Sequence, residues 1–118
     1  MSLMFEEIDS QESPIGEILL RRRRIPAFGE RDIYEVKLGD EFLMSSMFYA
    51  AEEALSTLGL AAVQGEDLRV VVGGLGLGYT AVKALEDARI AELLVVEALD
   101  TVIGWHRDEL VPLGRVLN

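Results

Sequence analysis

The sequence predicts an α/β fold made of an N-terminal antiparallel β-hairpin region followed by the first part of a parallel sheet. In the first half, short runs of alternating apolar and polar residues are joined by tight turns, which indicates an antiparallel ribbon. In the second half, two short runs are apolar throughout, which is typical of strands buried on both faces. A helical pattern separates these runs, and the order strand, helix, strand favours a parallel sheet.

The first half contains three expected strands. Residues 16–24 form the first, and residues 33–38 alternate apolar with charged side chains. Gly39 then begins a tight turn into residues 41–44, which completes a hairpin. Four consecutive arginines occupy residues 21–24. Successive side chains of a strand point to opposite faces, so we expect these arginines to pair with carboxylates or be solvated rather than bind phosphate or nucleic acid.

A helix is predicted to follow the hairpin, with Ser45 or Ser46 as its N-cap. Apolar side chains at helical spacing would form its buried stripe, namely Met47, Phe48, Ala51, Ala54, Leu55 and Leu58. The polar loop at residues 64–67 comes next. We place a domain boundary there, with a β-ribbon and linking helix in residues 4–63 and a βαβα portion in residues 64–118.

The second half begins with a buried strand over residues 68–72 that leads into the glycines of residues 73–78. A helix over residues 79–86 follows. A second buried strand covers residues 93–96 and ends on Glu97. This arrangement brings the glycine loop and Glu97 to the same edge of the predicted sheet, because parallel strands share the direction of their carboxyl ends.

A last helix is expected from Asp100, which would cap it, to near Pro112. The helix carries Val102, Ile103, Trp105, His106 and Leu110. The helical spacing of Trp105 places it in the core or an interface. His106 has no evident serine partner, so we expect a solvated side chain rather than a general base.

Gly74, Gly76 and Gly78 occupy the turn where a bound nucleoside would lie against the backbone. A side chain in that turn would collide with the ligand, so glycine is needed there. The second strand then needs an acceptor at its tip for the ribose hydroxyls, and Glu97 follows Gly78 at close to the roughly 20 residues expected for that role. These four residues predict an adenine nucleoside site in a Rossmann-like fold.

The glycine spacing leaves two classes of nucleoside open. Gly74-x-Gly76-x-Gly78 is usual for S-adenosylmethionine-type sites. The dinucleotide fingerprint requires a glycine or alanine three residues after its second glycine. Tyr79 fails that requirement when the motif starts at Gly74, whereas Ala81 meets it when the motif starts at Gly76.

Composition narrows the function further. The formal net charge of −10 argues against a nucleic-acid binder and would favour cationic ligands such as polyamines or sulfonium compounds. The chain has no cysteine and one histidine, so a transition-metal site is not expected. No apolar stretch is long enough to span a bilayer, and the acidic N-terminus is unlike a signal peptide. A cytoplasmic protein without a membrane partner is therefore predicted.

Residues 71–78 resemble the first motif of the spermidine synthase-like group within the S-adenosylmethionine-dependent methyltransferase superfamily. Residues 95–103 and 110–114 resemble that group's segment with a ribose-binding acid, a valine-isoleucine pair on a helix and a closing leucine-proline-leucine. The resemblance covers nearly the whole chain. It implies a methyltransferase-type parallel sheet preceded by a small β-domain.

The resemblance also implies transfer of an aminopropyl group from decarboxylated S-adenosylmethionine to an amine such as putrescine. Glu97 would hold the ribose, and residues 74–78 would face the methionine-derived part. The acceptor amine must be deprotonated and desolvated beside carboxylates before it attacks the carbon next to sulfur. A nucleoside and a polyamine are thus the implied partners, and no metal is needed.

The family's catalytic aspartate lies after a later strand, and this sequence ends at Asn118 before such a strand. We therefore assign no catalytic residue and expect an incomplete and inactive portion of an aminopropyltransferase. Two parallel strands bury little surface, which predicts a homo-oligomer. The alternatives are an S-adenosylmethionine-dependent methyltransferase of the same fold and a non-catalytic oligomer that retains the fold.

Overall fold

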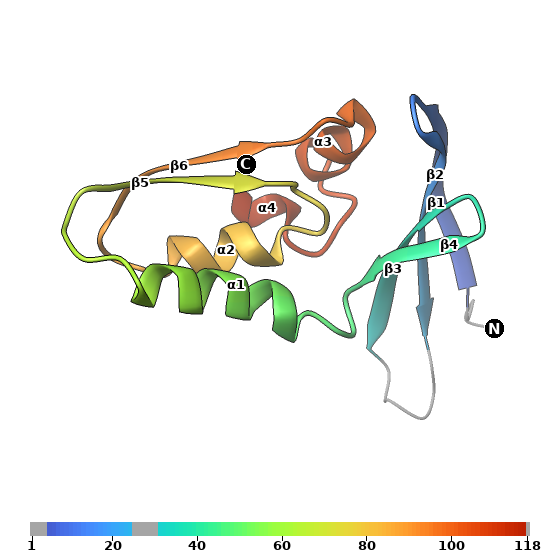
Figure 1. Cartoon of the computed structure of the whole chain (residues 1–118). Coiled ribbons are helices and arrows are strands. Elements are labelled where there is room, and N and C mark those ends of the chain that lie inside the picture. Colours follow the sequence, from blue (N-terminus) through green and yellow to red (C-terminus); the bar gives the residue numbers. More distant parts are fainter. Residues whose placement is uncertain (1–4, 25–30, 118) are drawn as a thin grey trace. The chain divides into compact units, whose positions relative to one another are not determined.

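The computed structural model describes residues 5–24 and 31–117, and the chain divides into two compact units between Phe48 and Tyr49 (Figure 1). The first unit contains an antiparallel sheet, and the second contains a parallel sheet with helices. The fold class predicted from the sequence is therefore confirmed. Within the described ranges, no helix is both long and apolar enough to cross a membrane.

The first unit is a ribbon of four strands in the order β1-β2-β3-β4, each antiparallel to the next. Their bounds are β1 Phe5–Ser13, β2 Gly16–Arg24, β3 Asp32–Leu38 and β4 Glu41–Ser45. The sequence predicted the last three strands but missed β1, whose mostly polar residues carry no alternating pattern. β1 forms because it pairs with β2 along its whole length and sets carboxylates opposite the arginines of β2.

Each of the four arginines of β2 meets a carboxylate, as the sequence predicted. The pairs are Arg21–Glu35, Arg23–Glu35, Arg22–Glu6 and Arg24–Asp32. Alternation along the strand turns Arg21 and Arg23 to one face, and both guanidinium groups reach the buried Glu35 there. The four arginines are thus paired with three carboxylates, of which only Glu35 is buried.

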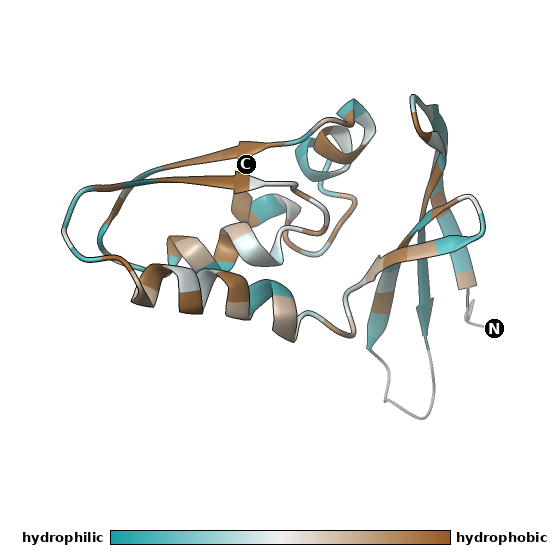
Figure 2. Ribbon diagram, in the orientation of Figure 1, coloured by the Kyte–Doolittle hydropathy of each residue, from teal (hydrophilic) through white to brown (hydrophobic). Residues whose placement is uncertain are grey.

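The described residues of the second unit form two parallel strands and four helices, which Figure 1 labels. In chain order these are α1 Ala50–Ala61, β5 Leu68–Gly73, α2 Tyr79–Leu85, β6 Ile90–Val96, α3 Asp100–Arg107 and α4 Gly114–Leu117. The predicted strand-helix-strand crossover is therefore present, with α2 between β5 and β6. Figure 2 shows that both strands are hydrophobic along most of their length.

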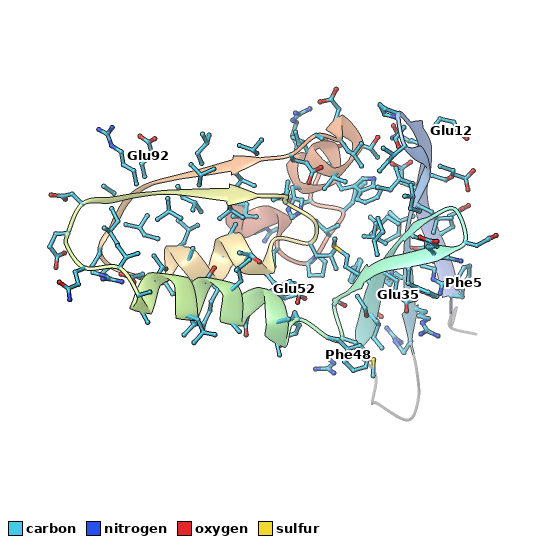
Figure 3. All side chains as sticks on the ribbon, in the orientation of Figure 1. Phe5, Glu12, Glu35, Phe48, Glu52 and Glu92 are labelled. Carbon is cyan, nitrogen blue, oxygen red and sulfur yellow. The ribbon has the colours of Figure 1, made fainter. Side chains whose placement is uncertain are left out.

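The two faces of the parallel sheet are unequally covered. Val72 on one face is 7% exposed, whereas Val71, Leu94 and Val96 on the other face are 66%, 54% and 55% exposed. Figure 3 shows that Glu92, which lies on the same face of β6 as Leu94, points away from α1 and α2. Parallel sheets are normally covered on both faces, so the exposure of this apolar face is unusual for a parallel sheet.

Helix α1 begins later than the sequence predicted, at Ala50 with Tyr49 in the cap position and no side-chain cap. The prediction of a serine N-cap was wrong, because both serine hydroxyl groups form hydrogen bonds in the segment before the helix. Ser46 Oγ accepts a hydrogen bond from the Tyr34 backbone at 2.8 Å, and Ser45 Oγ accepts one from the Met47 backbone at 3.1 Å.

The contacts of α1 place it in the second compact unit. Ser56, rather than a leucine, is its buried side chain, and its Oγ donates to the Thr80 carbonyl of α2 at 2.6 Å. Thr80 in turn donates to the Glu52 carbonyl at 3.0 Å. The small hydroxyl side chains let the two helices pack closely. The compact units thus divide before α1, whereas the sequence placed a domain boundary after it, between residues 63 and 64.

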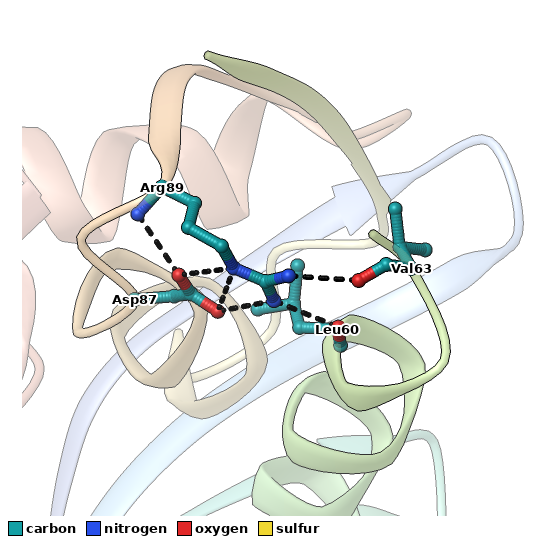
Figure 4. Close-up of polar contacts among 4 residues, drawn as sticks. All are labelled: Leu60, Val63, Asp87 and Arg89. Atoms are coloured by element: carbon teal, nitrogen blue, oxygen red, sulfur yellow. Dashed lines mark hydrogen bonds and ion pairs between the residues drawn. The ribbon is translucent and has the colours of Figure 1, made fainter. Parts of the chain in front are cut away.

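Arg89 joins the end of α1 to the start of β6 (Figure 4). Its guanidinium donates to the Leu60 and Val63 carbonyls, both at 2.7 Å, and also to Asp87 at 2.8 Å. The side chain and the backbone N–H of Arg89 both donate to the Asp87 carboxylate and lower its pKa to about 2. The last turn of α1 has no basic residue of its own, so Arg89 supplies the positive charge that a helix C-terminus favours.

Candidate functional site

The glycine loop between β5 and α2 requires glycine at alternate positions. Gly74, Gly76 and Gly78 have φ angles of +92°, +51° and +92°, in the left-handed region that other residues rarely adopt. The loop leaves the sheet through a hydrogen bond from the Gly74 N–H to the Val96 carbonyl and closes with one from the Gly78 N–H to the Leu75 carbonyl, both 2.8 Å. The backbone itself therefore explains the alternating pattern.

Two of these glycines differ in their surroundings. A Cβ atom added to Gly74 would meet no heavy atom within 4 Å, so the space beside it is open. A Cβ atom added to Gly78 would lie 2.8 Å from Leu117 Cδ1 and 3.1 Å from His106 Cε1. Packing within the protein thus accounts for Gly78, whereas Gly74 leaves room for a ligand.

Glu97 follows β6 and faces the glycine loop. Its Oε1 accepts a hydrogen bond from the Leu75 N–H at 2.8 Å, and its Oε2 accepts one from the Leu99 N–H at 3.0 Å. The structure therefore brings Glu97 and the loop together, as expected from the shared edge of the sheet. An ionised carboxylate has about four acceptor positions, so two remain after these backbone contacts.

The contact with Glu97 also determines how α3 begins. Leu99, not Asp100, occupies the cap position, with extended backbone angles and no side-chain cap. The predicted capping role of Asp100 was wrong, because Glu97 accepts a hydrogen bond from the Leu99 N–H and the helix starts at Asp100, one residue earlier than a cap at Asp100 would require. Asp100 lies in the first turn, where its charge is favourable for the helix dipole.

His106 is the site residue that the sequence placed incorrectly. It was expected to be solvated, but it is 4% exposed, and its Nε2 lies 2.7 Å from the Gly76 carbonyl oxygen. These two residues are 30 positions apart, so no local pattern could indicate the contact. Trp105 beside it is 2% exposed, which confirms the core position expected for that side chain.

A cavity of about 420 Å³ adjoins Glu97 and the glycine loop within the second unit. Its polar lining comes from Glu97, His106 and Arg107. The remaining walls are apolar and are formed by Leu75, Leu85, Leu93, Val95, Ile103, Val116 and Leu117. Mostly apolar walls with a few polar groups are typical of small-molecule sites of this size.

Within the part of the chain that the structure describes, no cluster of three or more His, Cys, Asp or Glu side chains could hold a metal ion. The polar groups at the loop and its cavity are backbone groups, the Glu97 carboxylate, the His106 imidazole and the Arg107 guanidinium. Such a set can orient hydroxyl groups and a cation. It offers no evident nucleophile.

Comparison with known proteins supports the fold. The chain is similar to a solved structure of spermidine synthase in complex with the transition state analogue AdoDATO, with a TM-score of 0.70 and 20% sequence identity. The match covers 88% of this chain and 33% of the other, so the chain spans about a third of that enzyme's length. No family model and no curated protein matched the sequence. The chain thus has an α/β fold consistent with the N-terminal part of spermidine synthase.

Proposed function

We propose that the chain binds an S-adenosylmethionine-type nucleoside at the carboxyl ends of β5 and β6, as part of a spermidine synthase-like aminopropyltransferase. The observation that carries the proposal is the position of Glu97, whose carboxylate faces the glycine loop and keeps acceptor positions for two ribose hydroxyls. Gly74, Gly76 and Gly78 would let the methionine-derived part lie against the loop. The similarity to a spermidine synthase bound to AdoDATO supports this class of ligand.

Charge supports the decarboxylated form of the ligand. Decarboxylated S-adenosylmethionine keeps the sulfonium and ammonium groups but lacks the carboxylate, so it carries more positive charge than S-adenosylmethionine. A chain with a net charge of −10 attracts such a cation. The aminopropyl acceptor in the complete enzyme would be a polyamine-type amine, which the same negative field would also attract.

The test is a calorimetric titration of the full chain with decarboxylated S-adenosylmethionine and, separately, with S-adenosylmethionine. We expect the decarboxylated form to bind more tightly. We expect Glu97→Gln to weaken binding by about tenfold to a hundredfold, the range for hydrogen bonds to a charged group. Glu92→Gln is the matched control, because it removes the same charge from an exposed position on β6, the strand that Glu97 follows.

Each outcome has a distinct meaning. Tighter binding of S-adenosylmethionine would instead support the methyltransferase alternative. A similar loss in both glutamate variants would show that net charge, and not the site, governs binding. Absence of binding by either compound would contradict the nucleoside site in this chain and leave the non-catalytic alternative.

A further inference from the structure

The glycine loop is held from both sides of its backbone. Glu97 holds an amide of the loop, the N–H of Leu75, and His106 contacts a carbonyl of the loop, that of Gly76. A carbonyl oxygen only accepts hydrogen bonds, so the contact at 2.7 Å requires a hydrogen on His106 Nε2. The imidazole is therefore a donor aimed at the loop from α3.

The Gly76 carbonyl belongs to the peptide that joins Gly76 to Leu77. This peptide is planar, so the direction of its carbonyl also determines the direction of the Leu77 N–H. Gly76 has a φ of +51°, and a glycine backbone changes conformation more easily than that of any other residue. Without a partner for its carbonyl, the peptide plane next to Gly76 would be free to rotate.

The position of His106 is itself tightly determined. The side chain is 4% exposed, and its Cε1 lies where a Cβ atom on Gly78 would be only 3.1 Å away. Its backbone carbonyl lies 2.8 Å from where a Cβ atom on Gly114 would be, so α4 can approach only because residue 114 is glycine. Close packing between α3 and α4 thus restricts the position of the imidazole.

We infer that His106 is a positioning residue for the nucleoside site, whose Nε2–H fixes the Gly76 peptide and so orients the glycine loop toward the ligand. The identity of the ligand in this inference rests on the proposed function, whereas the hydrogen bond between His106 and Gly76 does not. It assigns His106 no role in proton transfer. The imidazole acts through the loop backbone.

The first measurement is made on the unaltered chain without ligand. Nitrogen NMR of His106 is expected to show hydrogen on Nε2, with a coupling across the hydrogen bond to the Gly76 carbonyl carbon. A neutral imidazole with its hydrogen on Nδ1 would overturn the inference. This readout does not depend on whether a nucleoside binds.

The second measurement compares three variants in calorimetric titrations with decarboxylated S-adenosylmethionine and in amide exchange of the glycine loop. His106→Leu removes the donor, and we expect about tenfold weaker binding with faster loop exchange. His106→Gln retains an amide donor at similar reach and is expected to restore part of both. Val102→Ala, which removes buried apolar volume one turn earlier on α3, controls for loss of stability.

The outcomes separate the two proposals. Loop exchange in His106→Leu equal to that in Val102→Ala would refute the positioning role, even if the chain binds no nucleoside. Faster loop exchange without any nucleoside binding by the unaltered chain would refute the proposed function and retain the role of His106 in ordering the loop. If His106→Leu fails to fold, the His106→Gln variant and the coupling across the hydrogen bond still test the positioning role of His106.

Discussion

Glu109 adopts a backbone conformation that usually belongs to glycine. It follows α3 with a φ of +58°, and the N–H groups of Glu109 and Leu110 donate to the carbonyls of His106 and Trp105. This is the Schellman arrangement, in which the residue after the cap takes the left-handed conformation. A side chain destabilises the left-handed conformation. Glu109 nevertheless adopts it at the end of α3, the helix that carries His106.

Glu109→Gly is therefore expected to raise the free energy of unfolding by about 1 kcal/mol. The lost ion pair with Arg115 matters little, because its atoms are 3.6 Å apart and the Arg115 side chain is 86% exposed. Urea denaturation measures the change. Glu109→Ala removes the same carboxylate without relieving the backbone, so an equal gain in both variants would contradict this explanation.

At the residue scale, the sequence predicted which residues meet at the candidate site only where they belong to one local motif. The three glycines and Glu97 could be recognised because their spacing reflects the turn and crossover of one βαβ unit. The role of His106 could not, since its contact with Gly76 depends on how α3 folds back on the loop. The contrast between Gly74 and Gly78 could not be predicted either, because it depends on a contact between Gly78 and Leu117, 39 residues further along the chain.

At the element scale, the strands with clear alternation or continuous apolar character were predictable, and those without were not. β1 is determined by its partner strand, and the start of α1 is determined by a turn that uses Ser45 and Ser46. Likewise, the apolar stripe predicted for α1 does not form its buried face, since Leu55 and Leu58 are 66% and 70% exposed. For β1 and for Ser46, a contact with a distant part of the chain thus overrides the local preference.

The contact between Asp87 and Arg89 gives the end of α1 a defined dependence on pH. The folded-state pKa of Asp87, about 2, lies below the unfolded value of about 3.9. A lowered carboxylate pKa stabilises the fold above the unfolded pKa, and the stabilisation is lost as pH falls through the folded pKa. The contribution of Asp87 should therefore be constant near neutral pH and decline between about pH 4 and about pH 2.

The measurement compares unfolding of the unaltered chain and Asp87→Asn in urea at several pH values. We expect the variant to be less stable at neutral pH and the difference to narrow below about pH 4. Asp108→Asn, a carboxylate for which no ion pair is seen among the described residues, serves as the control. A difference for Asp87→Asn that stays constant into acid would show that the contact with Arg89 does not depend on the charge of Asp87.

At the scale of the whole molecule, the exposed face of the parallel sheet determines behaviour in solution. Val71, Leu94 and Val96 form an apolar surface that a soluble protein would normally cover. The net charge of −10 opposes contact between copies. We therefore expect the isolated chain to self-associate, and to do so more strongly as sodium chloride screens the repulsion.

Sedimentation at increasing salt tests this expectation. Leu94→Thr combined with Val71→Thr should reduce association, because threonine keeps a branched side chain suited to a strand but is less apolar. Ile15→Thr alters a similarly exposed apolar residue in the first unit and is expected to leave association unchanged. A monomer at all salt concentrations would refute the role of this surface.

The bond from Arg89 to the end of α1 has a consequence for the time at which this helix forms during synthesis. Arg89 emerges from the ribosome 29 residues after Leu60, the residue whose carbonyl it holds. At roughly 5–20 residues per second this is a delay of about 1.5 to 6 seconds. A helix of 12 residues is only marginally stable alone, so α1 stays largely unformed on the growing chain until β6 begins to appear. The first helix to be synthesised in this unit is thus among its later elements to become stable.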